Sequence, residues 1–240
     1  AQLQCSHFIL DGVICRNSGS WGVIPTRCNH VVIKNTKHFN NNDKLYEDDG
    51  MDIQESQNAF VQHTVIVSED DAFSTKTWTK NTDMAKTWPG NPEPLDSVIL
   101  DDCLAWSRCA TFKVGFGSYQ PQSNIIVRNS TSYRSMRAIA INPAYGGNYD
   151  NKNIIFNNID IEGFWPREGN ASKWLDVYTS HQGTSYGGPI SNVYIGNINV
   201  RTFGSVPSTL KGDDSLRQVN GIKFENIKVP DRDEYATSLS

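Results

Sequence analysis

The sequence predicts an all-β chain folded as a right-handed parallel β-helix. Short apolar strands rich in Val and Ile recur along the chain at intervals of 23, 29, 38, 28, 29, 39 and 29 residues. Each strand begins at a polar residue and is followed by Asn or Asp, which suit tight turns. No segment shows the apolar period of a surface helix. A repeat of this length is typical of a solenoid, in which each coil buries its inner face against the next.

Eight strand segments follow one another in chain order. They are SHFILDGVIC from Ser6, NHVVIKNTKHF from Asn29, NAFVQHTVIV from Asn58, DSVILDDCLAW from Asp96, NIIVRNSTSY from Asn124, NIIFNNIDI from Asn153, NVYIGNINV from Asn192 and GIKFENIKV from Gly221. The spacing predicts parallel strands stacked in register at 29–35, 58–67, 96–101, 124–128, 153–156 and 192–195. The competing folds, a β-propeller or a β-sandwich, need antiparallel hairpins with short turns, and the sequence has few such signals.

Two intervals are long enough to hold inserted loops. The first insert, 77–95, contains Trp78, Trp88 and three prolines, and the second, 164–189, contains Trp165, Trp174 and Tyr186 among its aromatic residues. Inserts on a solenoid usually lie on its binding face. We therefore expect both loops to border the functional surface.

Composition limits the domain count and the partners. A chain of 240 residues can bury one complete core, so we expect a single β-helix domain over 1–240. The first residues, AQLQCSHFIL, are typical of a strand rather than of a leader peptide, so we expect earlier coils to be missing. The net charge of −4 argues against a nucleic-acid or anionic-membrane partner. The chain has no run of 18 apolar residues, so we expect no transmembrane helix.

The polar composition favours an extracellular protein. Charged residues make up only 20% of the chain, while Asn, Ser, Thr and Gly are plentiful, as in turn-rich secreted β-proteins. Two sequons, at Asn129 and Asn170, are compatible with glycosylation. We therefore expect a secreted monomer.

Five cysteines give an odd count, so at least one thiol has no partner within the chain. Cys5 and Cys28 each directly precede a repeat, so we expect them on adjacent coils about 5 Å apart, either bonded or in contact. Cys15 is then an unpaired core residue, and the states of Cys103 and Cys109 stay open. The Cys and His positions show no zinc-type spacing, and we expect no metal or other cofactor.

The segment EDDGMDIQESQNAFVQHTVIVSEDDAFSTK, residues 47–76, is the strongest functional signal. Asp49 and the pair Asp70-Asp71 are 21 residues apart, about one coil. Because neighbouring strands lie roughly 4.8 Å apart, this spacing brings three carboxylates onto one patch. Hydrolysis of a glycosidic bond needs a carboxylic acid and a carboxylate on opposite sides of the sugar. The alternatives are solvated turn residues and a calcium site.

The same segment resembles the one that defines polygalacturonases and their relatives, glycoside hydrolase family 28, whose fold is the pectin-lyase-like β-helix. Upstream, RNSGSWGVIPTRCNHVVIKN resembles that family's preceding coil. The resemblance implies an inverting glycoside hydrolase in which Asp49, Asp70 and Asp71 match the three catalytic carboxylates. It also implies that Lys76 matches a Lys common in bacterial members.

Two departures bear on the substrate. Where the family has Gly-His-Gly, this chain reads SRCATFKVGFGS, and where it has an Arg-Ile-Lys clamp, this chain reads AIAINP, with Ala140 and Asn142. A pocket for a uronate needs fixed cations, so we expect a neutral polysaccharide, or at least one other than polygalacturonate. CLAWSRCATFKVGFGSYQ also resembles the dextranase–isopullulanase family, glycoside hydrolase family 49, which leaves a dextranase-like α-glucanase as an alternative.

Within the trio, the sequence favours Asp71 as the general acid, with Asp49 and Asp70 orienting the water. Three close carboxylates repel one another, so one keeps its proton to higher pH. We expect their oxygens to lie about 5–9 Å apart, the range that leaves room for a water. Asp52, in the same motif, is expected to point the other way or to cap a turn.

Several side chains are candidates for substrate contacts. Lys76, Lys113 and Arg137 are expected to bind hydroxyls, beside Asn142, while Trp78 is expected to stack on a sugar ring. Three further aromatic residues are weaker candidates for stacking, namely Trp88, Trp106 and Tyr119. Trp106 and Trp21 lie in the strand repeat and fit the core equally well. Outside the enzymes, the rival hypothesis is a non-catalytic polysaccharide-binding β-helix module.

Overall fold

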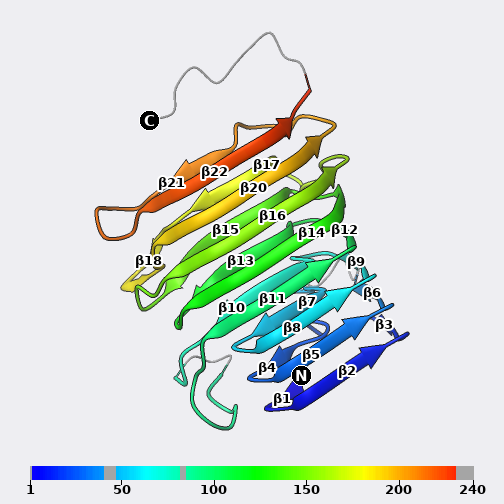
Figure 1. Cartoon of the computed structure of the whole chain (residues 1–240), viewed down its shortest axis with the longest axis vertical. Helices are drawn as coiled ribbons and strands as arrows, with labels where there is room; N and C mark the ends of the chain where they lie inside the picture. The colour runs from blue at the N-terminus through cyan, green and yellow to red at the C-terminus, as the bar shows by residue number, and fades with distance from the viewer. Residues whose placement is uncertain (1, 41–46, 82–84, 231–240) are drawn as a thin grey trace.

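The chain forms a stack of parallel β-coils (Figure 1). The computed structural model describes residues 2–40, 47–81 and 85–230, and within these ranges it contains strands and no helix. Every pairing between coils is parallel, and one short antiparallel pair joins β18 (His181–Gln182) to β19 (Ser185–Tyr186). The predicted right-handed parallel β-helix is confirmed.

The coils run through strands of two sheets, with three strands in each of the early coils and, from β13 on, one long strand in the second sheet for each strand in the first. The first sheet has eight strands, namely β1 (Gln2–Leu3), β4 (Pro25–Thr26), β7 (Met51–Gln54), β10 (Phe73–Thr77), β13 (Ala110–Ser118), β15 (Arg137–Gly146), β17 (Lys173–Tyr178) and β21 (Thr209–Lys211). The second has twelve, namely β2 (Ser6–Asp11), β3 (Ile14–Arg16), β5 (Asn29–Lys34), β6 (Lys37–Asn40), β8 (Gln57–Gln62), β9 (Val65–Ser68), β11 (Leu95–Asp101), β12 (Leu104–Ser107), β14 (Gln122–Arg134), β16 (Asn151–Ile161), β20 (Ile190–Val200) and β22 (Val219–Lys228).

The predicted strands are present, but their extents differ, and the segments 153–156 and 192–195 are only parts of β16 and β20. The segment 58–67 is interrupted at His63, whose positive φ of 49° turns the chain between β8 and β9. The segment 124–128 is only part of β14, which runs on to Arg134 and pairs with both β11 and β12. In the second sheet, each later coil therefore has one long strand where each early coil has two short ones.

One left-handed backbone position marks the true repeat. Positive φ values between 52° and 63° recur once per coil, at His7, His30, Asn58, Ser97, Asn124, Asn153, Asn192 and Gly221. Asn and Gly tolerate this conformation at low cost. The register pairs Asn29 with Gln57, and not with Asn58. The predicted starts at Ser6, Asn29 and Asp96 therefore lie one residue before this row, and three of the seven intervals change by one residue.

The asparagines of this row also bind one another. The Asn153 side chain donates to Asn124 (3.0 Å) and accepts from Asn192 (2.7 Å). A second row includes Asn129, which donates to Asp101 (2.8 Å) and accepts from Asn158 (2.9 Å). The amide of this sequon is thus engaged in the ladder, whereas the other sequon asparagine, at 170, is exposed.

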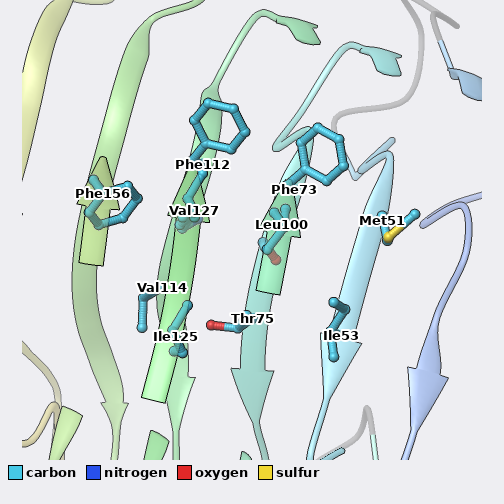
Figure 2. A pocket seen from close by; sticks show the side chains of 12 residues that line it. Met51, Ile53, Phe73, Thr75, Leu100, Phe112, Val114, Ile125, Val127 and Phe156 are labelled. Carbon is cyan, nitrogen blue, oxygen red and sulfur yellow. The ribbon is translucent and has the colours of Figure 1, made fainter. Parts of the chain in front are cut away.

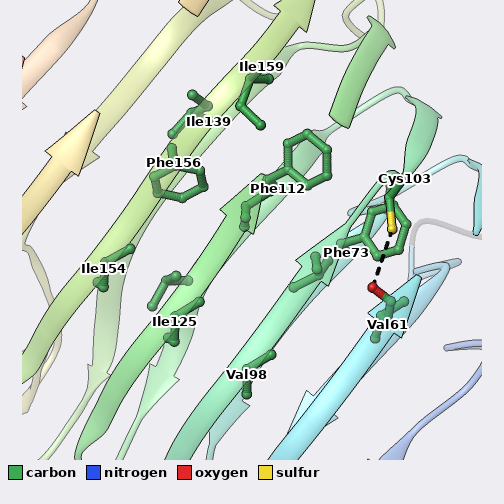
Figure 3. Close-up of a cluster of buried hydrophobic side chains, with 14 of the residues drawn as sticks. Val61, Phe73, Val98, Cys103, Phe112, Ile125, Ile139, Ile154, Phe156 and Ile159 are labelled. Atoms are coloured by element: carbon green, nitrogen blue, oxygen red, sulfur yellow. Dashed lines mark hydrogen bonds between the residues drawn. The ribbon is translucent and has the colours of Figure 1, made fainter. Parts of the chain in front are cut away.

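The interior of the coils is a continuous apolar core (Figure 3). Phe112 and Phe156 are its largest fully buried side chains, and burying a side chain of this size stabilises the fold by roughly 1.5–3 kcal/mol. A cavity of about 10 Å³ remains between Met51 and Phe156 (Figure 2). It has room for about one water at most. This cavity is therefore too small for any ligand larger than a water.

The cysteines are free thiols. The backbone amide of Cys5 lies 3.3 Å from the Cys28 sulfur, so the two residues are in contact on adjacent coils but unbonded. Cys103 is buried, and its thiol points to the Val61 carbonyl (Figure 3). Cys15 is only partly buried against the core.

The first insert covers one corner of the early coils. Arg27 donates to the Pro89 carbonyl (2.6 Å), and its guanidinium lies over the Trp88 ring. Trp88 therefore packs against Arg27, and residues 82–84 of this insert lie outside the described residues.

Among the described residues, no helix has the length and apolarity needed to cross a membrane.

Candidate active site

The outer face of the eight-stranded sheet carries a row of polar side chains. Along β7, Met51 and Ile53 point into the core (Figure 2), so Asp52 between them faces outward. The register then aligns outward residues of successive coils, which are Asp52, Ser74, Lys113, Ala140 and Asp176. Parallel stacking thereby gathers charged side chains from residues far apart in the sequence.

The three predicted carboxyls lie where the chain enters this sheet. Asp49 precedes β7, and Asp70 and Asp71 form the turn before β10. Asp49 and Asp71 are each only 2% exposed, whereas the Asp70 side chain is 17% exposed. Carboxyl oxygens of Asp70 and Asp71 lie within 4.8 Å of each other and of the Cys109 sulfur. This pair is closer than the expected 5–9 Å.

Lys76 joins Asp49 to Asp52. Its Nζ lies 2.6 Å from Asp49 Oδ2 and 2.7 Å from Asp52 Oδ1. Ser74 also donates to Asp52. The expectation that Asp52 points away or caps a turn is therefore wrong, because the pleat of β7 places its side chain on the same face as Lys76.

The single positive charge of Lys76 is shared by two carboxylates, so it offsets only part of the cost of burying the negative charge of Asp49. Burial raises the pKa of Asp49 well above its ordinary value, and the Asp52 charge adds to the rise. Burial alone would lower the pKa of Lys76, but the charges of Asp49 and Asp52 more than offset it and raise that pKa. Lys76 therefore stays charged, and Asp49 binds a proton more readily than an ordinary Asp.

Asp71 has the opposite environment. Its Oδ2 accepts a hydrogen bond from Lys113, and its Oδ1 accepts one from the Ala110 amide (3.1 Å). Burial alone would raise the pKa of Asp71, but the charges of Lys113, Lys76 and Arg137 hold it well below its ordinary value. Asp71 is therefore ionised throughout the neutral range.

Asp70 is the accessible member of the trio and has a looser ion pair. The Arg167 guanidinium lies 3.4 Å from its Oδ2 and also donates to the Glu69 carbonyl oxygen. Burial raises the pKa of Asp70 to about 6, and the Asp71 charge adds to the rise, while Lys113 and Arg167 oppose it. Asp70 therefore exchanges its proton near neutral pH.

Beyond Lys113 the polar row continues toward the C-terminal coils. Arg137 donates to the Cys109 sulfur (2.9 Å) and lies 3.6 Å from Asp176. Lys173 lies 3.3 Å from Asp176. Asn142 is fully buried and donates to the Asp176 carbonyl (2.7 Å), and its own Oδ1 has no hydrogen-bond partner. The structure thus places Arg137 beside the carboxyl pair and Asn142 one row away.

Aromatic rings line two borders of this surface. Trp21 and Trp78 stack with centroids 6.3 Å apart, and Tyr119 continues the row at 6.2 Å from Trp78. Lys76 Nζ lies 4.0 Å from the Trp21 ring centroid, a cation–π contact. On the other border, Trp106 and Trp165 meet edge to face at 5.1 Å. Trp21 and Trp106 are therefore outer-surface residues and not part of the core.

Among the described residues, a single group offers three metal-ligating atoms in reach of one another, namely Asp70, Asp71 and Cys109. Lys113 and Arg137 bond directly to Asp71 and Cys109. Two of the three candidate ligands therefore already contact positive charges of the protein. The arrangement is that of a carboxylate site neutralised by the protein's own cations.

Comparison with solved structures identifies the fold. A Yersinia enterocolitica family 28 exopolygalacturonase superposes with a TM-score of 0.63 at 15% identity, over 94% of this chain and 44% of that one. A hyperthermoactive exopolygalacturonase from Thermotoga maritima gives 0.55 at 14% identity, over 93% and 52%. An endo-xylogalacturonan hydrolase from Aspergillus tubingensis gives 0.51 at 15% identity, over 95% and 60%. The fold is polygalacturonase-like.

The polygalacturonase-like fold agrees with the resemblance seen in the sequence, and the three structural neighbours are glycoside hydrolases. This chain spans about half the length of those proteins. No protein-family profile matches the sequence, and no curated protein matches it.

Sequence reasoning missed three residues of this candidate site. Asp52 had a visible signal, since it lies two residues before Gln54 in an alternating strand and shares the parity of the outer face. Asp176 and Arg167 had none, because the first depends on the register of β15 with β17 and the second on the path of an insert.

Proposed function

We propose that this protein is an extracellular inverting glycoside hydrolase that cleaves a neutral polysaccharide. The observation that supports it is the contrast between Asp70 and Asp71. Two adjacent carboxyls lie within 4.8 Å, one accessible with a pKa of about 6 and the other buried and ionised beside Lys113. Carboxyls held in different protonation states are what acid–base cleavage of a glycosidic bond requires.

The proposed reaction uses one proton donor and one acceptor. Asp70 gives its proton to the glycosidic oxygen as the bond from that oxygen to the anomeric carbon breaks. A water attacks the anomeric carbon from the opposite face, and Asp49 takes the proton that this water loses. Asp71 keeps its negative charge throughout and stabilises the positive charge that develops on the sugar ring.

This assignment exchanges the roles that the sequence favoured for Asp70 and Asp71. Asp71 holds a hydrogen bond from Lys113 and has a depressed pKa, so it carries no proton to donate at neutral pH. Asp49 acts as the base in its ionised form, which the charged Lys76 ammonium 2.6 Å away favours. Asp49 also comes from the preceding coil, before β7, and is separate from the adjacent Asp70–Asp71 pair.

The pairing of the cations supports a neutral substrate. Each of the five cationic side chains around the carboxyls has a carboxylate within 3.6 Å in the described structure, namely Lys76, Lys113, Arg137, Arg167 and Lys173. A desolvated uronate needs a cation that is not already neutralised. Trp78 and Tyr119 instead offer rings for the apolar faces of sugars. A dextranase-like α-glucanase is one form of this proposal.

The test is a polysaccharide panel. The purified protein is incubated with dextran, other neutral glucans, xylogalacturonan and polygalacturonate, and new reducing ends are measured. Cleavage of a neutral polymer, with NMR showing the inverted anomer in the first product, supports the proposal. Cleavage of polygalacturonate alone would contradict the substrate class, and retention of configuration would contradict the mechanism.

A second function, a non-catalytic polysaccharide-binding module, is favoured by one observation. Lys76 and Lys113 bind Asp49 Oδ2 and Asp71 Oδ2 directly, and both of these aspartates are almost fully buried in the resting site. Binding to a polymer of the panel, measured by calorimetry, without release of reducing ends at any pH from 4 to 8 supports the module over the enzyme.

A further inference from the structure

The loop between β16 and β17 reaches back across two coils to the carboxyl pair. Arg167, in this loop, lies 3.4 Å from Asp70 Oδ2 and donates to the Glu69 carbonyl oxygen, although these residues are 97 and 98 positions apart in the sequence. The two contacts fix the guanidinium against both the backbone and the side chain of one turn.

The loop is anchored on either side of Arg167. Trp165 meets Trp106 edge to face, and its amide donates to the Ser135 carbonyl (3.0 Å). The Asn170 amide closes a turn onto the Arg167 carbonyl (3.0 Å). Trp106 is followed by Ser107, whose hydroxyl donates to the Asp70 carbonyl (2.7 Å). The Trp165–Trp106 contact that holds the loop and the Asp70 turn that Arg167 reaches are therefore linked through the adjacent residues Trp106 and Ser107.

We propose that Arg167 is a positioning residue, which holds the Asp70 carboxyl in the orientation from which it donates its proton. This role rests on the proposed function, in which Asp70 is the acid. The charged groups facing Asp70 are Asp71 from its own turn, Lys113 from β13 and Arg167 from the loop, with the Cys109 thiol beside them. Of the two cations, Lys113 bonds Asp71, so Arg167 is the one that contacts Asp70.

The structure also predicts an effect on protonation. Arg167 favours the ionised form of Asp70, so its removal raises the pKa of that carboxyl. The Arg167 side chain is 21% exposed, so solvent weakens the effect, and we expect a shift of about one pH unit, the lower end for a charge at this distance. The neighbouring Glu69 has its own partner in Arg108 (3.1 Å) and does not compete for Arg167 through its side chain.

The experiment is an NMR titration of carboxyl-¹³C-labelled Asp, without substrate, in the wild type, Arg167→Gln and Arg167→Lys. Asp70→Asn assigns the resonance. The control is Arg134→Gln, because Arg134 is exposed and packs on Trp165 at the same corner but makes no contact with Asp70. The Asp70 pKa is expected to rise by about one unit in Arg167→Gln, to stay near the wild type in Arg167→Lys, and to be unchanged in Arg134→Gln.

An Asp70 pKa in folded Arg167→Gln equal to that of the wild type would overturn the proposal, as would an equal rise in Arg134→Gln. The pH dependence of kcat/KM on the polymer found active gives a second readout, whose alkaline limb moves with the NMR value. If no polymer is cleaved but the titration shifts as expected, the proposed function fails and the Arg167 contact stands. If cleavage occurs without the titration shift, Arg167 has no positioning role.

Discussion

Asp70 and Asp71 are consecutive residues whose carboxyls lie within 4.8 Å, and their pKa values move in opposite directions. The difference comes from their partners, because Lys113 bonds Asp71 directly while Arg167 meets Asp70 at 3.4 Å. Asp71, bonded to Lys113, is therefore an anion at neutral pH, whereas Asp70 keeps its proton to a higher pH than an ordinary Asp. The predictions below follow from this division and from the coil geometry that supports it.

The first prediction concerns the pH dependence of cleavage. If Asp70 donates the proton, activity requires its protonated form, and kcat/KM falls as pH rises through the Asp70 pKa of about 6. Initial rates between pH 4 and 8, at constant ionic strength, measure this limb. Activity that stays constant up to pH 8 would exclude Asp70 as the acid.

The second prediction concerns the buried ion pair of Lys113 with Asp71. Lys113→Met removes one partner and leaves a buried carboxylate, which costs about 3–5 kcal/mol of unfolding free energy at pH 7. Because the folded-state pKa of Asp71 is depressed, this stabilisation is present above the ordinary Asp pKa of about 4 and is lost as pH falls.

Urea unfolding at pH 7 and pH 3 measures the effect, and the difference between wild type and Lys113→Met is expected to shrink at pH 3. Lys152→Met is the control, since Lys152 makes an exposed ion pair with Asp150 and should cost under about 1 kcal/mol. An equal loss of unfolding free energy in both variants would show that the buried Lys113–Asp71 pair contributes no more to stability than the exposed Lys152–Asp150 pair.

The third prediction concerns the asparagine ladder. Asn153 has a φ of 56° and bonds Asn124 and Asn192 on the adjacent coils. Asn153→Ala loses both hydrogen bonds and strains the backbone, so it is expected to cost about 2 kcal/mol or more. Asn153→Gly loses the same bonds but adopts positive φ freely, as Gly221 does in the same row. Thermal unfolding should therefore rank the wild type above the Gly variant and the Gly variant above the Ala variant, and the reverse order of the variants would argue against backbone strain.

The β-helix was predictable from the sequence because each coil contains one residue in the left-handed conformation, and the residue types that favour this conformation recur at the coil interval. The left-handed row needs Asn, Gly or a similar residue at a fixed interval, and Asn124, Asn153 and Asn192 make that interval visible. The same pattern could not fix the register to one residue, since strands beginning at Asn29 and Asp96 start one position before that row. The gathering of Asp49, Asp70 and Asp71 followed from the interval alone and needed no finer register.

The partners of these carboxyls were beyond reach of the sequence pattern. The roles of Asp70 and Asp71 depend on which cation meets each one, and Lys113 and Arg167 come from a later strand and a distant loop. Trp88 and Trp78 lie in the same insert, yet one packs on Arg27 and the other on Trp21. Spacing predicts which coil a residue belongs to, but not the path of a loop over the surface.

The central claim is that Asp70 donates the proton to the leaving group, and the Asp70→Asn variant tests it most directly. Its cleavage rate on the natural polymer is expected to fall at least about a hundredfold, since a positioned acid contributes roughly 10²–10⁴ in rate. The rate on an aryl glycoside of the same sugar, whose leaving group needs no proton, is expected to fall far less. Equal losses on the two substrates, or a polymer rate like that of the wild type, would contradict the account.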